Sequence, residues 1–546
     1  MTTLAPETAA AFDQLLEPSR RSDVPGYVVA VAREGRTIYR QASGMASIEF
    51  AVANTPATRI RIASVTKQFT GLAVMLLVED GRLDIDKPVR HYLPELGGPN
   101  GAPTLRQLLN HTGGIRDALE SVAFFLTEGL FPLIPAGLTH AWSSRFSDGN
   151  FAPGEAWSYS NYGYMLLSRV IEKVSGLTLA ECFRQRLFEP LGMNDSELVP
   201  SDMDIAPGVA TSHIRMPDGR FRRGIYPCEE LVGGGGIVST VDDMLRWAAN
   251  LREPHRLGSR ASWDEILRPV DFADGAQSTY GFGIKRQIHR GVEMLWHDGS
   301  TFGSRCALFS FPEHALDIIV LANRSDAEPA AIALKIAEAL LADAFGPAKQ
   351  FADAAGREAL AGQYYSTATK RLFGIRVHAD KLPGKLMFAI DASPQGLLWD
   401  DAGTLRGEST AGPLVVRHAP PQGSSTVAQI ELELCGRRET YTRLPDTAPS
   451  AEALAADLVG EYRLQDFDTP VWITFDDGQL CIDLRSRFQP NRIQLAPLSA
   501  DVLLCTAAML GAPGVQGTVA LQRENGAVSG FFFSLQRTWN LRFARV

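Results

Sequence analysis

Apolar and polar positions in the first 345 residues follow strand and helix periods in turn. The segment Val24–Gly44 has two apolar runs separated by Glu34-Gly35, and it predicts a β-hairpin with that dipeptide as its turn. From Lys67 to Val78 apolar residues recur at helical spacing, which predicts a buried helix. Ala330–Phe345 predicts a long apolar helix that ends at Gly346-Pro347. Together these elements indicate an α/β unit bounded by a hairpin and a helix.

After Gly346 the pattern changes to short alternating strands, and helical periodicity nearly vanishes. The run Leu360–Tyr364 (LAGQY) resembles Leu458–Tyr462 (LVGEY), 98 residues later, and each unit closes with an arginine-containing strand. Pro445–Ser450 is the expected linker. The pattern predicts two sequential antiparallel β-barrels, at 346–450 and 451–546, after the α/β unit at 1–345. One large β-sandwich is the alternative.

Composition and charge narrow the possible partners. The formal net charge of −9 is spread along the chain without an acidic or basic block, so nothing favours a nucleic acid partner. No stretch approaches the ~20 uninterrupted apolar residues that a membrane helix needs, so no membrane association is expected. The first residues lack a basic segment followed by an apolar run, which makes the cytoplasm the expected compartment.

The cysteines, histidines and glycines do not form a cofactor pattern. Six cysteines lie far apart and include no CxxC pair, so we expect reduced thiols. The histidines, among them His111, show no HExxH or other metal-ligand spacing. Gly233–Gly236 lacks the Lys-Ser/Thr pair of a phosphate-binding loop, and we interpret it as a tight structural turn. No metal or other cofactor is therefore expected.

Ser64 and Lys67 form the first candidate for catalysis. A serine hydroxyl is a poor nucleophile near neutral pH, so it needs a base within hydrogen-bond reach. Positions i and i+3 share one face of a helix, which places the Lys67 amine beside the Ser64 hydroxyl. The free N–H groups of a helix start would favour a developing oxyanion. To act as a base, Lys67 must be neutral, and burial or a cationic neighbour can achieve this.

Two further groups of residues could complete such a site. Tyr159 could pass a proton to a leaving group, and Asn161 could hold a substrate carbonyl; a Pro-Gly turn followed by an anchoring aromatic residue is the structural alternative. His297 follows an apparent strand and could donate a hydrogen bond toward Tyr159 or the substrate, unless it is a surface histidine in a polar turn. Gly299 would let a substrate backbone approach closely.

The order and spacing of these three groups resemble a known family. SxxK at Ser64, YxN at Tyr159 about 95 residues later, and HxG at His297 about 136 beyond Asn161 are similar to the motifs of the penicillin-binding-protein and class C β-lactamase superfamily. The segments Thr104–Gly114 and Tyr280–Gly283 resemble the family's flanking segments. HxG stands where the β-lactamases have KTG, which points to the esterase and peptidase branch.

The resemblance implies a fold and a role for each residue. It implies a β-lactamase-like α/β (α+β) catalytic domain, and a catalytic domain followed by two barrels is similar to the bacterial D-aminopeptidases. Ser64 would be the acylated nucleophile, Lys67 its base and Tyr159 the acid/base partner. The residues that would bind substrate are Asn161, His297, Gly299 and Ser300, with the backbone N–H groups of Ser64 and Ser300 as the oxyanion hole.

The expected activity is the release of N-terminal D-amino acids from a small peptide, amide or ester. In the D-aminopeptidases a loop of the last barrel presents an acidic group to the substrate ammonium, but the corresponding stretch Leu503–Gln516 contains no acidic residue. An esterase or β-lactamase-like hydrolase without D-peptide preference is therefore an alternative. A catalytically silent binding protein of the same fold is another. The sequence leaves the preferred side chain, the response to β-lactams and the oligomeric state open, with room for a homodimer.

Overall fold

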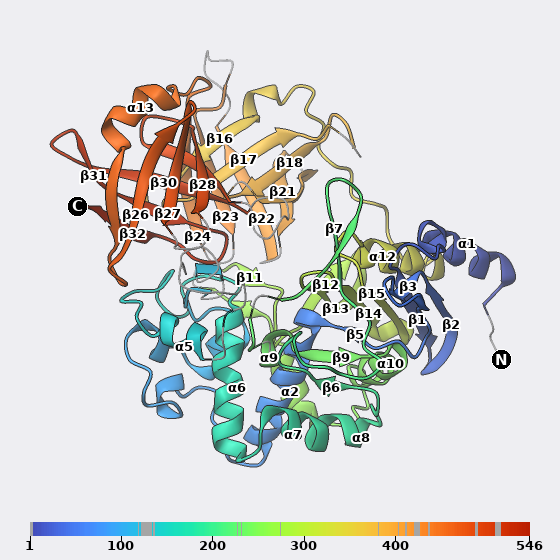
Figure 1. Ribbon diagram of the computed structural model, residues 1–546. Helices are drawn as coiled ribbons and strands as arrows, with labels where there is room; N and C mark the ends of the chain where they lie inside the picture. The colour runs from blue at the N-terminus through green and yellow to red at the C-terminus, as the bar shows by residue number, and fades with distance from the viewer. Residues whose placement is uncertain are drawn as a thin grey trace.

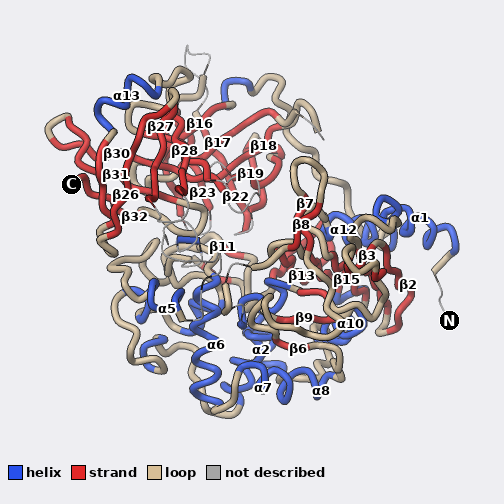
Figure 2. The backbone as a smooth tube through the Cα atoms, viewed as in Figure 1, coloured by secondary structure: helices blue, strands red, loops and turns tan. Residues whose placement is uncertain are grey.

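Three large antiparallel sheets organise the described part of the chain (Figure 1). One belongs to the N-terminal unit, and the other two form the C-terminal units, which are nearly all strand (Figure 2). The computed structural model describes residues 4–117, 120–121, 134, 137–226, 228–230, 232–272, 275–379, 382–391, 393–401, 403–409, 412–419, 426–434, 437–485, 490–507 and 515–546.

The N-terminal unit is built around a six-stranded antiparallel sheet with the order β12-β13-β14-β15-β1-β2. Residues of β1 alternate between two cores: Val28 and Ala30 lie in a core with α10 (Val241–Asn250), while Val29 and Val31 lie in a core with α1 (Pro6–Leu16) and α12 (Pro329–Leu340). Because both faces are covered, β1 and β15 are mainly apolar, with Asp317 as the buried exception in β15. The strands are β1 (Tyr27–Arg33), β2 (Arg36–Ser43), β12 (Lys285–His289), β13 (Val292–Ser300), β14 (Arg305–Phe311) and β15 (Leu316–Ala322).

The predicted hairpin and first helix are confirmed, and the last helix is shorter than predicted. Glu34 and Gly35 have φ of 53° and 73°, the positive values that a two-residue hairpin turn requires. The predicted helix 67–78 is α2 (Thr66–Glu79). The helix predicted over 330–345 is α12 (Pro329–Leu340). It ends early because the following turn is tied to the β12–β13 hairpin, where Gly346 donates to Arg290 O and Arg290 Nε donates to Gly346 O.

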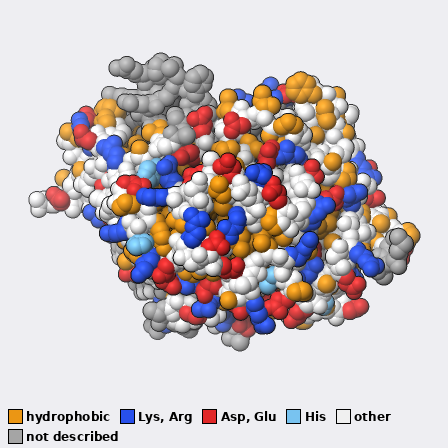
Figure 3. Space-filling view, turned by 90° about the horizontal axis from the view of Figure 1, so that it is seen from below, with side chains coloured by type: hydrophobic (Ala, Val, Ile, Leu, Met, Phe, Trp, Pro, Cys, Tyr) orange, Lys and Arg blue, Asp and Glu red, His pale blue; other side chains and the backbone are white. Residues whose placement is uncertain are grey.

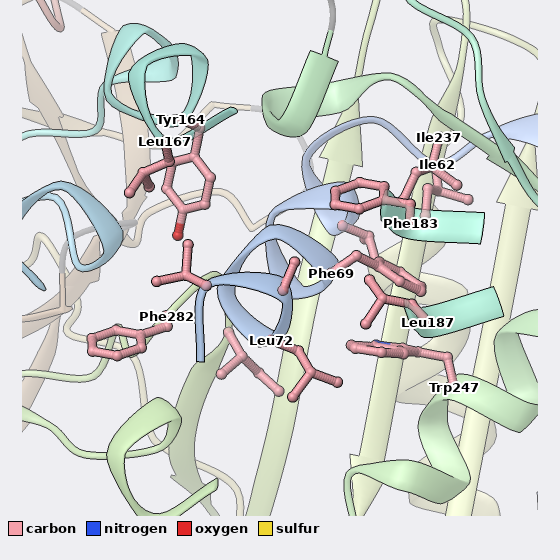
Figure 4. Packing of buried hydrophobic residues seen from close by; sticks show 14 of the residues in the cluster. Ile62, Phe69, Leu72, Tyr164, Leu167, Phe183, Leu187, Ile237, Trp247 and Phe282 are labelled. Atoms are coloured by element: carbon pink, nitrogen blue, oxygen red, sulfur yellow. The ribbon is translucent and has the colours of Figure 1, made fainter. Parts of the chain in front are cut away.

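Helix α2 lies at the centre of the N-terminal unit, and its residues from Thr66 to Leu77 are buried. Phe69 stacks on Trp247 of α10 (Val241–Asn250) at 3.8 Å between ring centroids, and Figure 4 shows α2 enclosed by aromatic and aliphatic side chains. Helix α6 (Asn161–Ser175) packs against it. The remaining helical elements are α1 (Pro6–Leu16), η1 (Glu17–Ser19), η2 (Ala63–Val65), η3 (Val89–His91), η4 (Pro99–Gly101), α3 (Leu105–Leu109), α5 (Leu138–Ser143), α7 (Leu179–Phe183), η5 (Arg184–Phe188), α8 (Glu189–Leu191), α9 (Val232–Gly235), α11 (Arg260–Ile266) and η6 (Pro312–His314).

Short strands connect these helices. Strand β5 pairs with β9 and leads the chain into η2 and α2. These strands are β3 (Met45–Ser47), β4 (Val52–Ala53), β5 (Ile60–Arg61), β6 (Glu197–Leu198), β7 (His213–Arg215), β8 (Phe221–Arg223), β9 (Ile237–Ser239), β10 (Val270–Asp271) and β11 (Gln277–Ser278).

The first C-terminal unit is a nine-stranded antiparallel sheet with the order β19-β18-β17-β16-β24-β23-β22-β21-β20. Its end strand β19 also contacts β21, so the sheet is nearly closed. The elements are η7 (Glu358–Leu360), β16 (Gly362–Tyr365), β17 (Leu372–Val377), β18 (Leu386–Ile390), β19 (Ser393–Leu397), β20 (Trp399–Asp401), β21 (Thr404–Ser409), β22 (Gly412–His418), β23 (Gln429–Leu434) and β24 (Arg437–Arg443).

The second C-terminal unit is a closed antiparallel barrel of the strands β25 to β32. Closure pairs β25 with β32 and removes the exposed edges of the sheet. A short helix, α13 (Ala451–Leu458), precedes the barrel and was not expected. The strands are β25 (Gly460–Leu464), β26 (Thr469–Asp476), β27 (Gln479–Arg485), β28 (Pro490–Pro497), β29 (Val502–Ala507), β30 (Val515–Glu524), β31 (Ala527–Ser534) and β32 (Leu541–Arg545).

The repeated LxGxY sequence forms the same contacts in both β units. Tyr364 donates to Leu360 O and Tyr462 donates to Leu458 O, each at 2.8 Å. The last strand of each unit supplies an arginine over the repeated tyrosine: Arg443 lies 5.9 Å from the Tyr364 ring centroid, and the equivalent distance from Arg545 to Tyr462 is 5.7 Å. The predicted arrangement, an α/β unit followed by two barrel-like units, is confirmed, with one barrel closed and the other nearly so.

Both β units lie on the same side of the N-terminal unit (Figure 1). Trp142 of α5 stacks on Phe467 of the barrel at 3.9 Å, so the two share a core. On the face seen in Figure 3, Lys and Arg side chains are intermingled with Asp and Glu. No helix among the described residues is long and apolar enough to cross a membrane.

Candidate active site

Ser64 lies at the entrance to α2, on the turn η2 between β5 and the helix. The turn is fixed by a bond from Ile62 N to Ile237 O at 3.0 Å, and Ala63 adopts a φ of 48° that non-glycine residues rarely take. Such a conformation persists only when surrounding contacts impose it. The Ser64 side chain is half-buried and lines a large cavity.

Lys67 is fully buried one helical turn after Ser64, with Nζ 3.4 Å from Ser64 Oγ. The amine donates to Asn161 Oδ1 at 2.9 Å and to Gly234 O at 2.6 Å. Burial, and secondly the positive charge of Arg537, lower the pKa of Lys67 well below its usual value. A neutral amine has two N–H bonds and one lone pair. The two acceptors use the N–H bonds, which leaves the lone pair for Ser64.

Tyr159 is brought to the same cavity by the segment before α6. Lys67 Nζ lies 4.8 Å from the centroid of its ring. The hydroxyl is buried, and no described residue forms a hydrogen bond of normal geometry with it. Burial raises the pKa of Tyr159 above its usual value, while the charge of Arg537 opposes this effect. The phenol therefore keeps its proton at neutral pH.

Asn161 also lines the cavity, but its amide group is engaged by the protein. Besides accepting from Lys67, it donates from Nδ2 to Asp117 Oδ2 at 3.0 Å. The structure thus places Asn161 between a buried carboxylate and the amine, where it holds Lys67 in position.

Strand β13 brings the HxG residues to the other wall of the cavity. Gly299 lies so close to η2 that a Cβ atom there would be 2.2 Å from Ile62 O, which explains the need for glycine. Ser300, one residue later, lines the cavity together with Ser64. His297 is buried, its Nε2 lies 2.9 Å from the Tyr280 hydroxyl, and burial lowers the pKa of its imidazole.

Three residues that contact the site residues were not identified from the sequence as functional. His111, with a φ of 64°, accepts a hydrogen bond from Ser160 N at 3.3 Å and lies 4.2 Å from the Tyr159 ring. The hydroxyl of Tyr280 contacts His297. The glycine run interpreted as a structural turn forms α9, whose Gly234 carbonyl binds Lys67. In the sequence, His111 and Tyr280 lie in the two flanking segments that resemble the family, and Gly234 lies in the glycine run, so these patterns could have indicated them.

The turn between β31 and β32 of the barrel also reaches the site. Gln536, Arg537 and Trp539 line the cavity, and the Arg537 guanidinium lies 4.7 Å from the centroid of the Tyr159 ring. The sequence pointed to a different barrel segment, Leu503–Gln516. Residues 508–514 of that segment lie outside the described residues, and Val515 beside them lines the cavity.

The cavity measures about 1020 Å³ and is enclosed by all three units. The first β unit contributes residues such as Arg371, Ile390 and Leu434. In the part of the chain that the structure describes, no group of three or more His, Cys, Asp or Glu side chains could hold a metal ion. The arrangement offers a nucleophile, a neutral amine and a protonated phenol, which together suit acyl transfer.

Comparisons with known proteins agree with this chemistry. The family described as Beta-lactamase matches residues 9–343. A D-aminopeptidase from Cereibacter sphaeroides is 26% identical over 547 residues, which cover 96% of each chain.

Two solved structures have a similar fold. The octameric penicillin-binding protein homologue from Pyrococcus abyssi is 23% identical with a TM-score of 0.54, and the match covers 80% of this chain and 98% of the other. A structure described as SurE with D-Leu is 25% identical with a TM-score of 0.51, over 80% of this chain and 99% of the other.

Proposed function

Because the chain belongs to the beta-lactamase family, we propose that it is an acyl-enzyme serine hydrolase that releases N-terminal D-amino acids from peptides, amides or esters. The observation that carries the proposal is the position of the Lys67 amine, buried and 3.4 Å from Ser64 Oγ, with both of its N–H bonds used elsewhere. In this arrangement only the lone pair of the amine faces the serine.

The acylation step follows from these contacts. Lys67 accepts the proton of Ser64 while Oγ attacks the carbonyl carbon of the substrate. The backbone N–H groups of Ser64 and Ser300 stabilise the oxyanion, each contributing about 3–4 kcal/mol. Tyr159 gives its proton to the leaving group. Water then attacks the acyl carbon and gives a proton to the Tyr159 phenolate; as the bond to Oγ breaks and the acid leaves, Lys67 returns its proton to Ser64 Oγ.

The D-amino acid specificity rests on the relatives. The Cereibacter protein that matches along nearly the whole chain is a D-aminopeptidase, and a structure similar to this one is described with D-Leu. Two alternatives remain: an esterase or β-lactamase-like hydrolase without D-peptide preference, and a catalytically silent binding protein.

A substrate panel separates these alternatives. It contains the p-nitroanilides of D-alanine and L-alanine, p-nitrophenyl acetate and nitrocefin, each with the native chain and with Ser64→Ala. We expect the D-anilide to be cleaved with a kcat/KM at least about 100-fold above that of the L-anilide, a difference of about 2.7 kcal/mol in transition-state binding. Equal rates on both anilides, or turnover of the ester or nitrocefin alone, would replace the proposed specificity by the first alternative.

Oligomeric state and compartment stay predictions. The sequence leaves room for a homodimer, and a cytoplasmic location is the expectation from the sequence. Light scattering on the purified chain would give the mass of the assembly directly.

A further inference from the structure

The β31–β32 turn, Leu535–Asn540, is held rigidly against the N-terminal unit. The carbonyl of Arg537 accepts from Asp117 N at 3.2 Å and from Asn150 Nδ2 at 2.9 Å. The Arg537 N–H donates to Glu120 Oε2 at 2.9 Å. These bonds use only the backbone of Arg537, so they position the residue without engaging its side chain.

Trp539 anchors the same turn between the two other units. It is 3% exposed, and its ring lies 5.4 Å from Phe151 of the N-terminal unit and 4.2 Å from the Arg371 guanidinium of the first β unit. Trp539 N donates to Asn150 Oδ1 at 2.8 Å. A turn fixed by contacts with two other units can present a side chain to the cavity with little loss of entropy on binding.

The Arg537 guanidinium emerges from this turn into the cavity. Its side chain is 37% exposed, and its nearest acid is Asp117, with Nη1 3.5 Å from Oδ2. No described residue accepts a hydrogen bond of normal geometry from the guanidinium. Two other cations of the cavity, Lys285 and Arg371, donate hydrogen bonds to Asp298 and Asp391. Arg537 differs from these two, because its ion pair with Asp117 is 3.5 Å long and leaves guanidinium donors available to a substrate.

We propose that Arg537 is a subsite for a carboxylate on the leaving group of the substrate, so that the preferred substrates are D-aminoacyl amino acids with a free C-terminus. This inference rests on the proposed function, because it takes Tyr159 as the donor to the leaving nitrogen. In a dipeptide the carboxylate carbon is two bonds from that nitrogen, and the guanidinium lies over the Tyr159 ring. The planar fork of arginine matches a carboxylate with two parallel hydrogen bonds.

The test compares two substrates that differ only in this charge: D-alanylglycine and D-alanylglycinamide. The native chain should prefer the dipeptide. In Arg537→Gln the ratio of kcat/KM for the dipeptide to that for the amide should fall about 10- to 100-fold, mainly through the KM for the dipeptide. The loss of the charge near Lys67 and Tyr159 lowers kcat/KM for both substrates by a common factor, which cancels in this ratio. Arg537→Lys should restore part of the preference. Arg523→Gln is the matched control, because Arg523 lies on β30 of the same barrel, is bonded to Asp501 and does not line the cavity.

Two results would overturn the subsite. One is an equal fall on both substrates in Arg537→Gln, which would assign the arginine to the electrostatics of Lys67 and Tyr159. The other comes from calorimetry with Ser64→Ala, if this variant binds dipeptide and amide equally. Binding needs no turnover, so the calorimetry tests the subsite even if the native chain cleaves neither substrate. The absence of cleavage would contradict the proposed function and not the subsite.

Discussion

Lys67 illustrates how much a single residue depends on its surroundings. Its spacing from Ser64 could be predicted from the sequence, because i and i+3 share a helix face. Its acceptors could not, since Asn161 and Gly234 lie 94 and 167 residues away. The same holds for Arg537, whose charge reaches Lys67 from the last barrel. Sequence motifs identify residues of a site, whereas the contacts that set their protonation come from the fold.

The lowered pKa of Lys67 predicts an acid limb in the pH profile. Activity requires the neutral amine, so kcat/KM should be constant where Lys67 is unprotonated and should fall as pH drops through its lowered pKa. Lys67→Met should lower kcat/KM about 100- to 10,000-fold and remove this limb. Stopped-flow acylation with a D-alanine p-nitroanilide between pH 5 and 9 measures both. An acid limb that persists in Lys67→Met would assign it to another group.

The elements around α2 show why the flanking motifs are glycine-rich. Gly283, in the segment Tyr280–Gly283, has a φ of 80°, and a Cβ there would lie 2.4 Å from the Lys67 carbonyl carbon. A Cβ on Gly71 of α2 would lie 2.6 Å from Phe282 O. The segment therefore packs directly against the backbone of the catalytic helix, a contact that the sequence pattern alone did not reveal.

Gly283→Ala should displace the start of α2 and reduce activity at least about 10-fold, because a shift of about 1 Å at a catalytic group has large effects. Gly291→Ala is the matched control: Gly291 has a φ of 88°, but no atom lies within 4 Å of the added Cβ. Both variants carry the strain of a positive φ, of order 1 kcal/mol. Thermal unfolding and kcat/KM measured together separate strain from displacement. Equal activity in the two variants would contradict the account.

The same scale shows where secondary structure could be predicted. The hairpin could be predicted from Glu34-Gly35 because a two-residue turn depends only on the backbone conformations that these two residues can adopt. The predicted end of α12, at Gly346, was wrong because the helix stops at Leu340. The chain leaves the helix to reach Arg290, which forms two hydrogen bonds with Gly346, and this tertiary contact cannot be seen in the local sequence.

At the scale of the whole molecule, the three units meet at one turn of the barrel. The order of the units and their β character could be predicted from periodicity and from the repeated LxGxY sequence. Their closure over the site could not, because it depends on the docking of Trp539 against Phe151 and Arg371. The boundaries at 345 and 450 stay predictions.

Trp539→Ala should loosen the barrel from the N-terminal unit. Removing a buried tryptophan costs about 3–5 kcal/mol, and the turn that carries Arg537 would lose its anchor. We expect a lower unfolding temperature and faster cleavage by a protease near 445–450. Trp399→Ala, on β20 and away from the cavity lining, is the control. Unchanged proteolysis in Trp539→Ala would show that other contacts, such as Trp142 with Phe467, hold the units together.

Covalent labelling tests the central claim most directly. The native chain is treated with a fluorophosphonate, and the modified peptide is located by mass spectrometry. The account predicts one adduct on Ser64, absent in Ser64→Ala and formed at least about 100-fold more slowly in Lys67→Met. An adduct on another serine, or equal labelling of Ser64→Ala, would contradict it.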